Sequence, residues 1–331
     1  MPSRKRAKRS FSRRFFLFAL FIVLVILAYT GAWFYAADTL EQRTITAIED
    51  LNAGHQRANC EEPTARGYPF RIGLFCRSVF YEDAENGVSV SAGAFRSAAQ
   101  VYQPMHTVGE LDAPARIATP YLPAIEAEWE NMRISARLTA SLPERLSSEA
   151  KNVVLTLDDD NRQPIARAGN IQAHTRQNGA DLDIALIAQT LTIDPGLTNG
   201  TAMPAIDGEL LVTLDDGVAL ASTSVPELRG RSGTVENLNL KIAGGNAGLT
   251  VKGPIRIAEN GLIDAELRVT VNEPQRIAQL VGQIVPDKRD EIAGITAGLA
   301  NLGAAPTLPV NIRQGRVFVG FLPLGSIPPI R

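Results

Sequence analysis

The sequence predicts a mainly β fold with minor α: an N-terminal transmembrane helix, then a long curved antiparallel β-sheet with two C-terminal helices packed on it. Three observations lead there. Residues 15–37 form an apolar run without a charged side chain. From about residue 70 onward, apolar residues recur at every second position, and turn pairs such as Asn178-Gly179 separate these segments. Strands with one apolar and one polar face are typical of antiparallel sheets, and Asn-Gly is a hairpin signal.

The N-terminus predicts a membrane anchor. Residues 1–14 form a basic cytoplasmic tail with seven Lys and Arg and no acid. As a helix, residues 15–37 span about 34 Å, enough to cross the hydrocarbon core of a bilayer. Only Arg43 and Arg57 follow in the next twenty residues, so the positive charge indicates an N-terminus in the cytoplasm. We therefore expect a single-pass protein whose partner along residues 15–37 is the lipid bilayer.

Two other interpretations of this N-terminus were weighed. A cleaved signal peptide has a shorter apolar core and a small residue before the cleavage site, whereas Phe34 and Tyr35 stand near that position here, which favours an uncleaved anchor. Residues 12–17 match the twin-arginine export pattern, although Phe18 occupies the place where that pattern usually has Lys. A basic orientation signal is the favoured interpretation, and the sequence leaves the export route open.

The charge balance of the remaining chain excludes nucleic acid as the expected partner. Removing the seven basic residues of the tail from 33 Lys and Arg leaves 26 against 35 Asp and Glu in residues 38–331, a formal charge of −9. Nucleic-acid binding needs a basic surface on the folded part, because each phosphate contact is made with positive charge.

Directly after the apolar run, residues 38–53 are expected to form a helical stalk. Its apolar stripe can dock on the following domain or pair with a second chain, and docking is the simpler expectation. The stripe and the glycine that would end the helix are Leu40, Thr44, Ile48, Leu51 and Gly54.

The two cysteines, Cys60 and Cys76, lie just beyond this stalk, sixteen positions apart. A thiolate-imidazole metal site would need four ligands, and His55 is the sole nearby candidate. A C-x-x-C redox motif is absent. In an exported domain such a pair most often forms a structural disulfide, which stabilises a loop of this length by about 3 kcal/mol. We predict a Cys60–Cys76 disulfide with Cys76 as the more buried partner.

The segment between the cysteines carries a family resemblance. Its residues Gly67, Tyr68, Pro69, Phe70 and Arg71 predict a turn, after which Phe70, Ile72, Leu74 and Cys76 alternate onto one strand face. Together with the basic tail, the single anchor and a C-terminal stretch over residues 309–325, this segment resembles the bacterial envelope family known as domain of unknown function 2125. The resemblance covers nearly the whole chain and implies the bacterial inner membrane, with the bulk of the chain in the periplasm. That family has no assigned reaction.

Residues 54–331 are expected to form one periplasmic β-rich domain, or two sub-domains that divide near residues 140–150. Apolar strands separated by acidic turns are also similar to the broad AsmA-like group of envelope proteins, whose long sheets curl into a groove with an apolar inside. Two late segments, residues 274–284 and 287–302, carry apolar residues at helical spacing. We expect them to be helices that cover part of the sheet, and the alternative is a lid or partner-binding hairpin.

The sequence offers no catalytic motif. Hydrolase, zinc-protease and nucleotide-binding motifs are absent, and the three histidines, His55, His106 and His174, lie in separate segments. We therefore expect a protein that is not an enzyme and needs no cofactor. The acidic residues 158–161 suit a hairpin turn better than a calcium loop. Three glutamates at strand spacing are interpreted as one solvated face: Glu126, Glu128 and Glu130.

The function expected from these features is that of a non-enzymatic, inner-membrane-anchored envelope protein. Its apolar sheet face would hold or pass lipid, with phospholipid as ligand, or support assembly of the outer envelope. The alternative is a membrane-tethered interaction module that docks an envelope protein on a sheet edge or on the stalk. A continuous apolar groove would favour lipid, and a filled core with an open polar edge would favour a protein partner.

Overall fold

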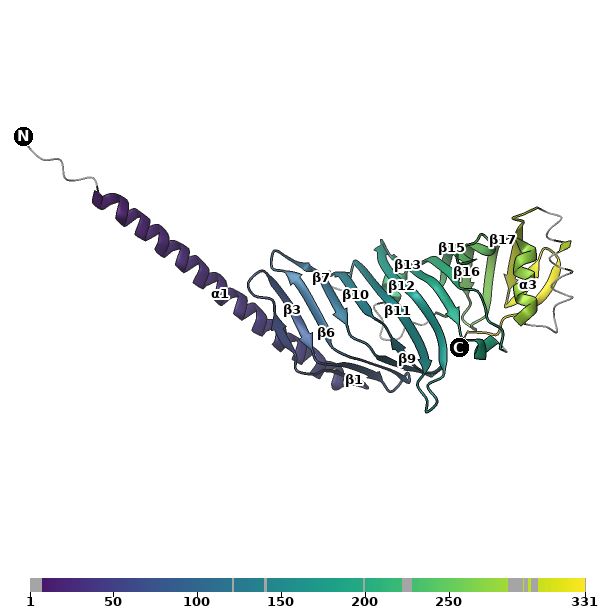
Figure 1. The fold of residues 1–331 in the computed structure, drawn as a ribbon, viewed down its shortest axis with the longest axis horizontal. Coiled ribbons are helices and arrows are strands. Elements are labelled where there is room, and N and C mark those ends of the chain that lie inside the picture. Colours follow the sequence, from purple (N-terminus) through teal and green to yellow (C-terminus); the bar gives the residue numbers. More distant parts are fainter. Residues whose placement is uncertain are drawn as a thin grey trace, which may run out of the picture.

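The computed structural model describes residues 8–120, 122–139, 142–198, 200–221, 228–284, 294, 297–298 and 303–330. A long helix, α1 (Lys8–Asn52), projects from an elongated β domain (Figure 1). Its stretch Arg13–Asn52 is long and apolar enough to cross a membrane, and the most apolar 18-residue window in it has a mean hydropathy of 2.6. The helix runs unbroken through the apolar run and the predicted stalk and stops just before Gly54.

Twenty strands follow in the described part of the chain: β1 Gln56–Cys60, β2 Thr64–Arg66, β3 Arg71–Cys76, β4 Val79–Asp83, β5 Val88–Ala92, β6 Phe95–Gln100, β7 Gln103–Leu111, β8 Ala115–Thr119, β9 Leu122–Glu128, β10 Asn131–Arg137, β11 Arg145–Leu157, β12 Pro164–Asn178, β13 Asp181–Ile193, β14 Ile206–Leu214, β15 Ser232–Ile242, β16 Gly248–Ile257, β17 Ile263–Asn272, β18 Thr307–Arg313, β19 Arg316–Val319 and β20 Leu322–Ser326. The helical elements besides α1 are a 3₁₀ turn at Pro195–Thr198, α2 at Gly217–Ala221 and α3 at Pro274–Ile284.

All twenty strands belong to one antiparallel sheet, and the chain winds through it as a meander. The first ten strands are the halves of five bent strands, paired as β1/β2, β3/β4, β5/β6, β7/β8 and β9/β10. The bend does not break the register, because Cys76 opposes Phe95 and, three residues on, Val79 opposes Ala92. Strand β11 spans both halves, since its first part pairs with β10 and its last part with β9. From β12 onward each strand adds to the previous one, as the sequence predicted.

The line of bends, which we call the crease, crosses the sheet. In the first five bent strands it lies in the short links between the halves. In β11 and β13 it continues as single residues with positive φ, Asn152 (51°) and Thr190 (50°). Across Asn152 the register with β12 is kept, because Ala150 opposes Ile171 and Val153 opposes Ala168. Both strands take the same odd step there, so the same face stays apolar across the crease. At Thr190 the register with β14 shifts by one residue, and such an extra residue bends its strand.

The late part of the sheet carries one of the two expected helices. Helix α3 lies beside the last strands (Figure 1) and begins at Pro274, whose side chain is fully buried. Proline suits a first helical turn because its missing N–H would have no partner there. The second expected helix, over residues 287–302, lies outside the described residues apart from three positions. Near residues 140–150 the sheet is continuous, because β10 and β11 pair from Asn131↔Lys151 to Arg137↔Arg145.

Candidate functional site

The candidate site is the apolar side of the sheet, which we call the inner face. One row of directly opposed residues crosses seven neighbouring strands: Ala173, Leu186, Leu210, Leu238, Val251, Val269 and Leu308. Toward the first strands the same row continues with smaller side chains: Ser148, Ile134, Gly109 and Ser97. With strands about 4.8 Å apart, the whole row is about 50 Å long.

Small residues line the crease on the inner face and are buried there, at 5 to 9% exposure: Cys76, Ala92, Ala115, Ala127, Ala150, Val153 and Ala168. Their neighbours on the other side of the sheet are exposed, among them Arg77, Lys151 and Arg167. A bent sheet shields the side toward which it folds. The inner face is therefore the concave side of the bend, and alanines allow its two halves to approach.

Away from the crease the inner face is open. Large apolar side chains stay accessible, with Leu186 44% and Leu240 38% exposed. Among the described residues, Pro274 is the large side chain that is fully buried. The accessible surface is 21703 Å², whereas a compact monomer of this mass exposes roughly 13,000 Å². The sheet is thus a single layer rather than one half of a filled core.

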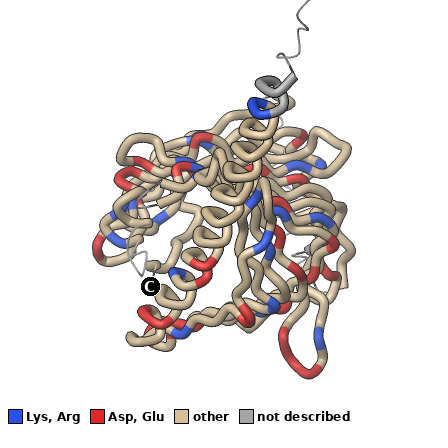
Figure 2. The backbone as a smooth tube through the Cα atoms, turned by 90° about the vertical axis from the view of Figure 1, so that its left-hand side faces the viewer, with Lys and Arg blue, Asp and Glu red and all other residues tan. Residues whose placement is uncertain are grey.

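The opposite side of the sheet, the outer face, is polar. Four residues oppose one another across β6, β7, β10 and β11 with alternating charge: Arg96, Glu110, Arg133 and Glu149. They line a groove of about 630 Å³. Hydrogen bonds from Arg96 lower the pKa of the Asp112 carboxyl, and Asp112 in turn raises the pKa of Arg96. Figure 2 shows Lys and Arg interspersed with Asp and Glu along the chain of the domain.

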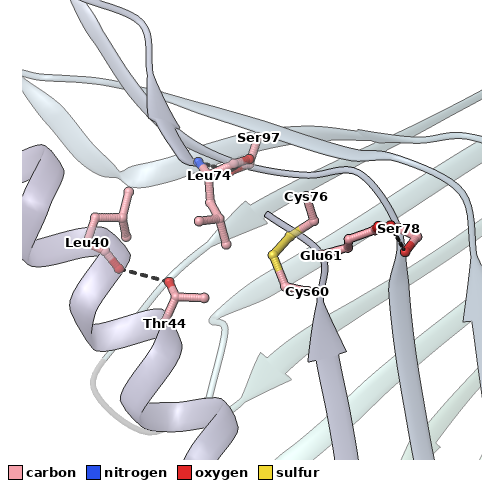
Figure 3. Close-up of a disulfide and its surroundings, with 8 residues drawn as sticks. All are labelled: Leu40, Thr44, Cys60, Glu61, Leu74, Cys76, Ser78 and Ser97. Atoms are coloured by element: carbon pink, nitrogen blue, oxygen red, sulfur yellow. Dashed lines mark hydrogen bonds between the residues drawn. A yellow bond between two sulfur atoms is a disulfide. The ribbon is translucent and has the colours of Figure 1, made fainter. Parts of the chain in front are cut away.

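Helix α1 closes the first end of the inner face. Leu40 and Thr44 point from α1 toward Leu74 and the disulfide (Figure 3). The Glu41 carboxylate accepts a hydrogen bond from the backbone N–H of Ala65 in β2 at 2.6 Å. The predicted stalk thus docks on the domain through its apolar stripe.

The predicted disulfide is present. Cys60 and Cys76 are bonded, with their Cα atoms 5.2 Å apart, and they join the ends of β1 and β3 at the crease. Cys76 is 5% exposed and Cys60 is half-buried, so the expected difference in burial is confirmed.

The segment from Gly67 to Arg71 forms the turn that holds α1. Gly67 has a φ of +121°, and a Cβ there would lie 2.8 Å from the Arg71 carbonyl oxygen. The indole N–H of Trp33 donates to that same Arg71 oxygen at 2.9 Å. One expectation was wrong: Phe70 precedes β3 and is 74% exposed, so it belongs to the turn rather than to the strand. The turn around Pro69 delays the strand by one residue.

Glu126 corrects a second expectation. Its side chain is 3% exposed, and the carboxylate accepts hydrogen bonds from Arg116 at 3.0 Å and from Arg162. Glu128 is 58% exposed, as a solvated face requires. Arg162 follows the acidic turn after β11 and folds back over Glu126. Because the two are 36 positions apart, no local pattern indicates this cluster.

The histidines and the acidic turn lie apart in the described part of the chain. The three histidines stay in separate elements, where His106 lies 3.3 Å from the Ser135 hydroxyl and His174 lies 3.2 Å from the Gln172 side chain. No group of three or more His, Cys, Asp or Glu able to hold a metal occurs in the described part of the chain. In the acidic turn, the Asp159 carboxylate accepts a hydrogen bond from the backbone N–H of Asn161 at 3.1 Å, as in an Asx turn.

A family model described as "Uncharacterized protein conserved in bacteria (DUF2125)" matches residues 33–328. The chain belongs to the DUF2125 family. The DUF2125 match begins at Trp33, whose indole binds the turn before β3, and it includes the docked half of α1, the disulfide and the sheet. A search of curated proteins gave no match.

Proposed function

We propose that this DUF2125 protein is a non-enzymatic envelope protein that holds or passes lipid along the inner face of its sheet. One observation carries the proposal: an apolar row across seven strands of the inner face, about 29 Å long, stays open to solvent. Each methylene that leaves water is worth about 0.8 kcal/mol, so an acyl chain lying along Leu186, Leu210 and Leu238 would be held without any specific polar contact. A role in outer-envelope assembly would depend on the same open apolar face.

Neighbouring leucines on β14 provide a matched test. Leu210 lies on the inner face and Leu211 on the outer face, and both are half-buried. The full chain is purified in detergent, washed, and examined by native mass spectrometry for bound phospholipid. We expect Leu210→Glu to lower the bound fraction several-fold, because a carboxylate replaces apolar contact. Leu211→Glu should retain the wild-type fraction.

Equal loss in the two β14 variants, or full retention in both, would contradict the proposal. A melting curve for each variant separates lost binding from lost folding. An unchanged melting temperature in Leu210→Glu is required before its lipid loss is interpreted.

The compartment is part of the same proposal. We infer an N-terminus in the cytoplasm and a periplasmic domain, supported by the basic tail and by the disulfide, since such bonds persist in oxidising compartments. Alkaline phosphatase fused after Gly54 should be active. Activity of a cytoplasmic reporter at the same position would reverse the orientation.

The protein-docking alternative has its own supporting observation at the last strand. Strand β20 is exposed at every residue, and Phe321 and Leu322 before and within it are 101% and 69% exposed. An open edge strand is a surface to which a partner can add a strand. In-cell crosslinking from residue 321 tests protein docking. A specific protein adduct that disappears with Leu324→Lys would support docking. The same variant should bind as much lipid as the wild type, which distinguishes protein docking from lipid binding.

A further inference from the structure

The turn before β3 is fixed to α1 at a depth within the apolar run. The Tyr29 hydroxyl donates to the Pro69 carbonyl oxygen, and the Thr30 hydroxyl lies 2.8 Å from that of Tyr68. The ring of Tyr68 stacks on Phe34 at 5.8 Å and meets Trp33 edge-on at 5.4 Å. All four helix residues belong to residues 15–37.

The depth of this turn follows from helix geometry. Crossing about 30 Å of hydrocarbon takes about 20 residues, so a span that starts at Phe15 reaches its far boundary near Trp33 and Phe34. Tyr29 lies four residues deeper, about 6 Å along the axis. Trp and Tyr are the side chains that favour this boundary. The turn bound to them therefore lies at the boundary between hydrocarbon and headgroups and reaches about 6 Å inside it.

The tip of the next hairpin lies beside this turn. The backbone N–H of Val101 donates to the Phe70 carbonyl oxygen at 3.1 Å. Figure 1 shows the ends of β3, β6 and β7 close to the middle of α1. The two tips expose five apolar or aromatic side chains, which we call the membrane rim: Tyr68 46%, Phe70 74%, Val101 37%, Tyr102 74% and Met105 62%.

The other end of the same strands differs in chemistry. The β4–β5 turn carries Asp83, Glu85 and Asn86, with the Asp83 carboxylate bound to the Asn86 side chain at 2.8 Å. Of the two ends, only the one beside Tyr29 and Trp33 is apolar, and the β4–β5 turn lies near the C-terminal end of α1, at Ala47 and Leu51. Arg71, exposed directly after the apolar turn, is placed to reach lipid phosphates.

We propose that the membrane rim inserts into the headgroup region of the bilayer that α1 spans, so that the first strands of the sheet rest on the membrane surface. The occupant is the bilayer itself, because the contacts at Tyr29, Thr30 and Trp33 place the rim at its boundary. The rim is a binding surface separate from the inner face, and it is present whether or not that face holds lipid.

Nitroxide depth measurements test the rim. The full chain is reconstituted in nanodiscs of phosphatidylethanolamine and phosphatidylglycerol, with one nitroxide at Tyr102→Cys or, as control, at Asn86→Cys. These sites lie beyond opposite ends of the bent strand β5/β6, and the native cysteines do not react because they form the disulfide. Apolar oxygen concentrates in lipid and a nickel chelate in water. We expect the ratio of oxygen to chelate accessibility to be several-fold higher at residue 102.

Equal ratios at the two sites would overturn the proposal, provided that a nitroxide at Ile22→Cys shows α1 embedded. A second variant, Phe70→Ser with Met105→Ser, should lower the ratio at residue 102, because the rim loses apolar contact with the bilayer. An unchanged ratio in this variant would also contradict the proposal. Leu210→Glu should leave the ratio unchanged, so failure of lipid binding on the inner face and failure of the rim give different results.

Discussion

Breaking the disulfide should cost a calculable amount of stability. Cys60 and Cys76 are 16 positions apart, and the chain-entropy model gives about 3 kcal/mol for a loop of that length. For a domain of this size, each kcal/mol lowers the melting temperature by roughly 2 °C. Cys60→Ser, at the half-buried end, should therefore lower it by about 6 °C.

Cys76→Ser should cost more, because position 76 is 5% exposed and its neighbours on the inner face are apolar. A hydroxyl buried there without a partner adds about 1–2 kcal/mol, or roughly 3 °C more. The assay is a melting curve of the full chain in detergent, followed by tryptophan fluorescence, to which Trp33 in α1 contributes together with Trp129. The Trp129 indole is held by the Leu111 carbonyl oxygen at 2.8 Å and reports on the sheet near the crease.

The double variant Cys60→Ala with Cys76→Ala is the control, because it removes the bridge without adding a hydroxyl. Its melting temperature should match that of Cys60→Ser. Equal losses in the two serine variants would refute the burial argument. Quantitative alkylation of two thiols in the unreduced native protein would refute the bridge itself.

Three further predictions concern the sheet. Glu126→Gln should destabilise the domain by about 1–3 kcal/mol, because the buried carboxylate binds two arginines, while Glu128→Gln on the exposed side should stay within about 0.5 kcal/mol; equal melting temperatures would contradict this. The hydrogen bond from Arg96 lowers the pKa of Asp112, so its stabilisation is complete above the ordinary carboxyl pKa of about 4 and is lost as the pH falls below it. Asp112→Asn should therefore reduce the acid-side fall in melting temperature, and an unchanged pH profile would argue against the pair. Gly73→Ala should unfold the first strands, measured as faster hydrogen exchange there, because its Cβ would overlap a carbonyl oxygen of β6.

The period-two pattern predicted the strands because each one has a polar and an apolar side. It did not predict the crease. In β11 the inner face reads Ala150, then Val153, because Asn152, with positive φ, shifts the alternation by one position while the register with β12 is kept. Within the sequence of a single strand, such a shift looks as if the alternation of apolar and polar residues had ended. Only the pairing with the next strand shows that both parts face the same way.

The candidate site was predictable where one local feature determined it. Two cysteines in a domain that the sequence predicts to be exported leave one pairing, so the disulfide followed from the sequence. Glu126 looked like its neighbour Glu128, because the difference between them depends on Arg162, which the fold brings back from beyond β11. The alternation, extended back to the turn, predicted that Phe70 belongs to the strand. The turn around Pro69 instead includes Phe70, and the strand begins at Arg71.

Helix α1 is held to the sheet at two heights, through Trp33 and through Glu41, with unbroken helix between them. Two such attachments stop the sheet from swivelling about the helix axis. One residue inserted between them would turn the upper attachment by about 100° against the lower, so both could no longer be made. The direction in which the concave side opens about the helix axis is therefore set by helical phase, and in a bilayer that α1 spans, the helix and the sheet would turn as one body.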